Sequence, residues 1–133
     1  MSPTLVNKFA ETGSQLHTDD PIVLAHYFNV SGYFHWLATE YNKTTNTCFG
    51  YTYEIEANGY SGVWCEFSLD ELAKLMHPNP EMPIPDVELD TFFPDDRKFS
   101  EICPKEFHSW REYQKMKEWL AIEKGSLSVE YER

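Results

Sequence analysis

The sequence predicts an α+β fold: an antiparallel sheet of four to five strands, arranged as a meander, with two main helices packed on one face. Three observations support this prediction. Between residues 22 and 67, four short segments rich in β-branched and aromatic residues are separated by turn signals. A capped amphipathic helix is predicted at 68–76, and a longer helix at 104–124. With 133 residues, we expect the chain to form a single domain, 1–133, with its own core.

The predicted strands are bounded by turns. Pro21 favours extended geometry at Asp20 and so introduces the first strand. Ser31-Gly32 is a candidate two-residue hairpin turn, the polar run 42–46 closes the second strand, and Asn58-Gly59 closes the third. The four segments are 22–30, 33–41, 47–56 and 62–67.

The first main helix begins with a capping pattern. Ser68 is followed three residues later by Glu71, the reciprocal pairing that satisfies backbone N–H groups at a helix start. Apolar residues then recur at helical spacing, and the run His77–Pro80 ends the helix. The apolar positions are Leu69, Leu72, Leu75 and Met76.

An acidic, proline-rich connection is predicted at 77–103. Six of the eight prolines sit in or border it, which favours an extended, irregular segment on the surface. Its stretch 81–96 carries six acids and no base. Pro104 suits the first position of the second main helix and Gly125 its C-terminal cap, and alternating apolar residues predict a final strand at 126–131.

The charge of the chain excludes one class of partner. There are 11 Lys and Arg against 22 Asp and Glu, a net charge of −11, and residues 1–96 hold fifteen acids and three bases. Because direct nucleic-acid binding needs clustered Lys and Arg, we expect none. Two interpretations of the acidic surface stay open: a solvated face that maintains solubility, and a surface that attracts a basic protein.

We expect a cytoplasmic protein that does not enter a membrane. The uncharged run 44–53 is polar and too short to cross a bilayer. The start Met1-Ser2-Pro3-Thr4 lacks the basic and apolar regions of a secretory signal. Three cysteines, an odd number, fit free thiols in a reducing compartment.

No metal site, cofactor or catalytic residue is predicted. The three cysteines and five histidines lack the Cys-x-x-Cys, His-x-x-x-His and His-Glu-x-x-His spacings of metal sites. His26 and His35 lie on adjacent predicted strands and could face each other, but two imidazoles do not make a structural zinc site. Cys48 or Cys65 could approach either histidine as a nucleophile, yet a cysteine among aromatic residues is more often a small buried apolar group.

Five short motifs support a family resemblance. They are Asp20-Pro21-Ile22-Val23, His26-Tyr27-Phe28, the run Trp36 to Tyr41, the run Cys48 to Tyr51, and the run Phe67 to Leu72. As a set they resemble an uncharacterised family of small proteins encoded on bacterial plasmids, conjugative elements and phages. The match covers about residues 19–76; Asn42 stands where that family usually has an acid, and Cys65-Glu66 where it often has Gly-Tyr. The resemblance implies a mobile-element context and no catalytic residues.

We therefore expect a small acidic, non-enzymatic interaction protein of a phage or mobile element. It would bind a basic protein surface. The most specific version of this hypothesis is a nucleic-acid mimic that inhibits a host nucleic-acid-binding enzyme. The alternative is a small cytoplasmic hydrolase or transferase that uses His35, Glu40 or Cys48 on the sheet. The oligomeric state stays open. The expected partner-binding residues are Asp86, Glu88, Asp90, Asp95 and Asp96 in the acidic connection, and Trp36, Glu40 and Tyr41 on the open sheet face.

Overall fold

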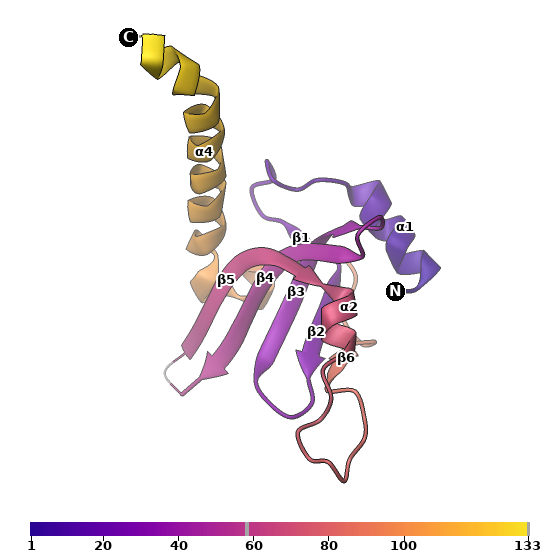
Figure 1. Ribbon diagram of the computed structural model, residues 1–133. Coiled ribbons are helices and arrows are strands. Elements are labelled where there is room, and N and C mark those ends of the chain that lie inside the picture. Colours follow the sequence, from indigo (N-terminus) through magenta and orange to yellow (C-terminus); the bar gives the residue numbers. More distant parts are fainter. Residues whose placement is uncertain (58, 133) are drawn as a thin grey trace.

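A five-stranded antiparallel sheet forms the centre of the protein (Figure 1), and it confirms the predicted α+β class. The computed structural model describes the backbone of residues 1–57 and 59–132, and the side chains of that part except those of residues 60 and 124–132. The strand order is β5-β4-β3-β2-β6. The strands are β2 (Ala25–Asn29), β3 (Phe34–Asn42), β4 (Thr47–Glu56), β5 (Gly59–Ser68) and β6 (Val87–Leu89).

The remaining elements surround this sheet. A separate two-stranded sheet pairs β1 (Ile22–Val23) with β7 (Arg97–Lys98), so the predicted first strand, 22–30, divides into β1 and β2. The helices are α1 (Pro3–Thr12), α2 (Leu69–Ala73), α3 (Phe99–Ile102), the 3-10 helix η1 (Pro104–Glu106) and α4 (His108–Glu132). None of the helices in the described part of the chain is both long and apolar enough to cross a membrane.

The meander from β2 to β5 is continuous, and one glycine permits its closest approach. Gly50 on β4 pairs with Ala38 on β3, next to a bulge in β3. A Cβ atom at Gly50 would lie only 1.7 Å from the backbone oxygen of Leu37. Only glycine therefore lets β3 and β4 pair at this point.

Two apolar clusters cover the two faces of the sheet. Successive residues of a strand point to opposite faces, and Leu37 belongs to one cluster whereas Ala38 belongs to the other. The Leu37 cluster includes Phe99 of α3 and Trp110 of α4. The Ala38 cluster includes Phe9 of α1 and Leu72 of α2, at one end of the sheet.

The two main helices consequently lie on opposite faces, not on one face as predicted. Figure 1 shows α2 in front of the sheet and the chain that leads into α4 behind it. The reason is local: α2 follows β5 without a linker, so Leu72 packs on the face to which the adjacent Phe67 points. A helical apolar pattern indicates that a helix has a buried side, but not which face of the sheet it covers.

Three further predictions about secondary structure are also wrong. Helix α2 ends at Ala73, because Met76 pairs with Pro85 in an extended bridge. The connection 77–103 is not irregular throughout, since it contains β6, β7 and α3. The predicted final strand at 126–131 is wrong, because α4 continues through Gly125 to Glu132. A single glycine costs a helix only about 1 kcal/mol and does not by itself end it.

Candidate functional site

The acidic connection, predicted as a partner-binding surface, uses several of its carboxylates within the protein. Asp86 is buried, and its carboxylate accepts hydrogen bonds from the backbone N and the Oγ of Ser31, at 2.9 and 2.7 Å. These bonds hold the pKa of Asp86 below its ordinary value. The expectation that Asp86 is exposed is therefore wrong: it fixes the connection to the turn between β2 and β3.

The other four predicted acids differ in their surroundings. Asp90 accepts hydrogen bonds from His26 Nδ1 and from the backbone N of Phe92, both at 3.0 Å. Asp95 forms an ion pair with Lys8 of α1. Glu88 and Asp96 are exposed, and neither has an ion pair or side-chain hydrogen bond within the described residues. The sequence shows six acids and no base within residues 81–96, but not that some of these acids bond to distant residues.

His26 and His35 face each other across β2 and β3, as their positions predicted. His26 Nε2 lies 2.8 Å from His35 Nδ1, and the two rings stack with their centroids 5.0 Å apart. Because Asp90 accepts the Nδ1 proton of His26, the neutral ring of His26 has its Nε2 free to accept the Nδ1 proton of His35. Partial burial, and then the proximity of His26, lower the pKa of His35.

The linked side chains of Asp90, His26 and His35 have the order of a catalytic relay, but within the described residues they form no hydrogen bond with Cys48, the nucleophile that the sequence suggested. Cys48 lies on the opposite face of the sheet, where burial raises the pKa of its thiol to about 12. Glu40 lies beyond the bulge, where it accepts a hydrogen bond from the backbone N of Gln15 at 3.1 Å. The residues of the enzymatic alternative, His35, Glu40 and Cys48, therefore do not converge on one site.

The described side chains also lack the geometry that a metal site requires. Among the described residues, no group of three or more His, Cys, Asp and Glu side chains is placed to hold a metal ion. We interpret the Asp90–His26–His35 chain as a structural latch that fixes the acidic connection to the sheet.

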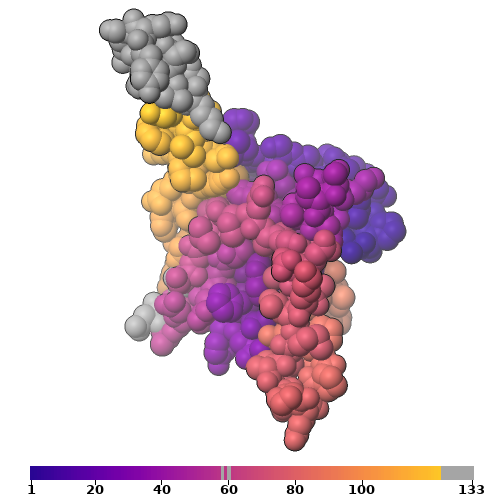
Figure 2. Space-filling view, viewed as in Figure 1, coloured from indigo at the N-terminus to yellow at the C-terminus, as the bar shows by residue number. Residues whose placement is uncertain are grey.

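The solvent-accessible part of the Ala38 side of the sheet is the strongest candidate site. We define the open face as two rows of cross-strand neighbours on the Ala38 side of the sheet. None of its residues is fully buried. Figure 2 shows the purple and magenta surface of these strands at the front of the molecule. The rows are Leu89, Tyr27, Trp36, Thr52 and Val63, and Val87, Asn29, Phe34, Glu54 and Ser61.

Aromatic and apolar side chains dominate the open face. The rings of Phe34 and Trp36 stack with their centroids 6.1 Å apart. Phe34 is 46% exposed and Val63 is 57% exposed. Glu54 is the one charged residue of the two rows, and Lys43 is the one base in residues 22–68 of the sequence. An apolar patch with an acidic residue and no base suits a basic protein partner.

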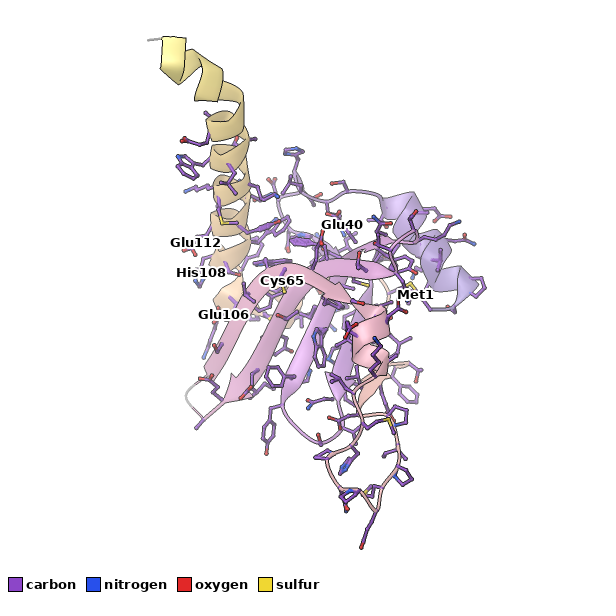
Figure 3. All side chains as sticks on the ribbon, viewed as in Figure 1. Met1, Glu40, Cys65, Glu106, His108 and Glu112 are labelled. Carbon is purple, nitrogen blue, oxygen red and sulfur yellow. The ribbon has the colours of Figure 1, made fainter. Side chains whose placement is uncertain are left out.

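Of the three residues predicted for this face, the structure places only Trp36 on it. Tyr41 lies on the same side of the sheet, but its ring packs against Phe9 of α1 with centroids 5.9 Å apart. Glu40 points to the other side, and Figure 3 shows it near the end of the sheet. Sequence reasoning missed Phe34, Val63 and Glu54, although strict alternation along each strand would have grouped them with Trp36.

Comparisons with known proteins add nothing to this geometry: no protein-family model, no curated protein and no solved structure matches the chain.

Proposed function

We propose that this chain is a non-enzymatic interaction protein that binds a basic protein surface through the open face. The observation that carries the proposal is the stacked pair of Phe34 and Trp36, in two cross-strand rows that contain no fully buried residue. Aromatic residues on a solvent-accessible, ordered surface are the usual anchors of protein interfaces. The strands hold these anchors in place before binding, which lowers the entropy that binding costs.

Charge selects the chemistry of the partner. The net charge of −11, and the presence of Glu54 among the apolar residues, attract a basic surface and repel phosphate backbones. Long-range attraction of this kind accelerates encounter and weakens as salt rises. We therefore expect an association rate that falls with ionic strength, together with a binding energy centred on the aromatic pair.

The resemblance to plasmid and phage proteins supports a partner from the bacterial host or from the mobile element itself. One form of such a partner is a nucleic-acid-binding enzyme, whose basic groove an acidic protein can occupy. Asp86, Asp90 and Asp95 bond to other residues of the protein, so the acidic stretch 81–96 is a weaker candidate for this mimicry. In our proposal the mimicking surface is the open face with its acidic surroundings.

The experiment uses two phenylalanines that differ in their location. Phe34 lies on the open face, whereas Phe92 is 92% exposed and lies outside it. A partner is captured from a bacterial lysate with the tagged chain, identified, purified and titrated against each variant. Phe34→Ala should weaken binding by about tenfold or more, as expected for an interface anchor, and Phe92→Ala should leave it unchanged. Equal affinities of the two variants would exclude the open face as the binding site.

A further inference from the structure

The outer edge of β5 is a second surface that the proposed function does not use. The strand order places β5 at one edge of the sheet and β6 at the other. The β4–β5 ladder runs from Thr47↔Ser68 to Glu56↔Gly59 without a register shift. Within the described residues, the backbone of β5 pairs with β4 and forms no backbone hydrogen bond with a further element.

Strand β5 lacks the features that usually protect a sheet edge. Natural edge strands are blunted by Lys, Pro, bulges or very short length, because an exposed edge pairs readily with another strand. Strand β6 follows this pattern, since it has three residues and comes soon after Pro85. Strand β5 has ten residues, no Lys, Arg or Pro, and Glu66 as its one charged residue.

An apolar groove runs beside this edge, between β5 and the first turns of α4. It has a volume of about 240 Å³, and Tyr51 and Gly62 line its sheet side. A Cβ atom at Gly62 would lie 2.5 Å from the ring of Tyr51, so glycine keeps this side open. A 2.9 Å hydrogen bond from Trp64 Nε1 to Ser109 Oγ fixes the distance between strand and helix. The other lining residues are Val63, Glu112, Tyr113 and Met116.

The charges around the groove favour a basic occupant. Figure 3 shows Glu112 on α4 beside β5. A second hollow, of about 220 Å³, shares Tyr113 with the groove and is lined by Glu40, Glu66 and Lys117. Partial burial, and then the carboxylates of Glu40 and Glu66, raise the pKa of Tyr113. Acids therefore outnumber bases along the edge.

We propose that the β5 edge binds an extended segment of a partner protein, which adds a sixth strand to the sheet. One face of the segment turns toward α4 and carries apolar residues, which enter the groove toward Tyr113 and Met116, and a basic residue, which meets Glu112 in the same groove. The net charge of −11 opposes pairing of this edge with a second copy of the chain. The two surfaces share Val63, but this inference does not depend on Phe34 or Trp36, because it rests on backbone groups of β5 and on the first turns of α4.

The test uses a fluorescein-labelled octapeptide in which threonine alternates with three valines and one lysine, so that the valines and the lysine share one face. We expect saturable binding to the full chain, with slowed hydrogen exchange at β5 amides. N-methylation of alternate peptide amides keeps every side chain but removes hydrogen-bond donors, each worth about 1 kcal/mol, so affinity should fall by about tenfold or more. Equal affinity of the methylated peptide, or absence of binding by the parent peptide, would overturn the proposal.

Matched variants of α4 locate the bound peptide. Met116→Lys should weaken binding by about tenfold, whereas Ile122→Lys, at a 63% exposed position on the same helix, should not. Glu112→Gln should weaken it about threefold, as for an exposed charge pair, and Glu118→Gln should not. Phe34→Ala should leave peptide binding unchanged, so the two proposals can fail separately. A dimer of the unbound chain that Met116→Lys dissociates would assign the edge to a second copy and refute the proposal.

Discussion

Removal of the central imidazole tests the interpretation of the Asp90–His26–His35 chain as a structural latch. His26 is the one residue that contacts both other members, at 3.0 Å from the Asp90 carboxylate and 2.8 Å from His35. Its ring also packs between Phe28 and Phe93, each with a centroid distance of 5.7 Å. The variant His26→Ala therefore breaks the link between β2, β3 and the acidic connection.

The expected loss of stability follows from these contacts. A hydrogen bond to a charged group contributes about 2 kcal/mol and one between neutral groups about 1 kcal/mol. The side chains of His26 and Asp90 are 16% and 27% exposed, so water replaces part of the lost bonding. Including the lost ring packing, we expect His26→Ala to lower the free energy of unfolding by about 3 kcal/mol.

The assay is urea denaturation followed by tryptophan fluorescence, with His17→Ala as the control. His17 is exposed, so its replacement should cost less than about 0.5 kcal/mol. Adding Asp90→Ala to His26→Ala should cost at least about 1 kcal/mol less than the two single changes added together, because both remove the same bond. A small loss for His26→Ala, or full additivity with Asp90→Ala, would refute the latch.

Three further changes test other parts of the structure. Ser68 Oγ accepts a 3.2 Å hydrogen bond from the backbone N of Glu71, so Ser68→Ala should cost about 1 kcal/mol in denaturation, and an unchanged midpoint would contradict the cap. The pKa of His35 is lowered from its ordinary 6.5, so the folded chain binds fewer protons than the unfolded chain; stability should be complete above pH 6.5 and fall below it in the parent, but less so in His35→Gln. Burial raises the thiol pKa of Cys48 to about 12 and of Cys103 to about 11, so a thiol reagent should modify half-buried Cys65 first in the native chain; equal rates would contradict the burial.

The sequence predicted correctly those helices, strands and contacts that depend on residues close to one another in the chain. The capping pattern at Ser68 marks a real helix start, because the bond it implies joins residues three positions apart. The strands β2 to β5 follow from alternation and turn residues, and the contact of His26 with His35 follows from their positions on adjacent strands. Each of these features is set by residues close in the chain or by one hairpin.

Features that depend on distant contacts were not predicted. Asp86 looks like one member of an acidic run, and only the fold brings it to Ser31, 55 positions away. The pattern of α2 gives it an apolar side, but the direction of Phe67 decides which face of the sheet Leu72 covers. The open face could be predicted only in part, because Tyr41 shares its side of the sheet with Trp36 yet lies beneath α1.

The most direct test of the central claim is to map the binding surface by amide chemical shifts. The isotopically labelled chain is titrated with the partner identified by capture, and shifted amides are assigned along the sheet and the acidic connection. The claim predicts that the largest shifts fall in the open-face rows, around Phe34, Trp36 and Glu54, and fade toward Tyr41 beneath α1. Largest shifts at Glu88, Asp95 and Asp96, with the open face unchanged, would contradict it and return the binding site to the acidic connection.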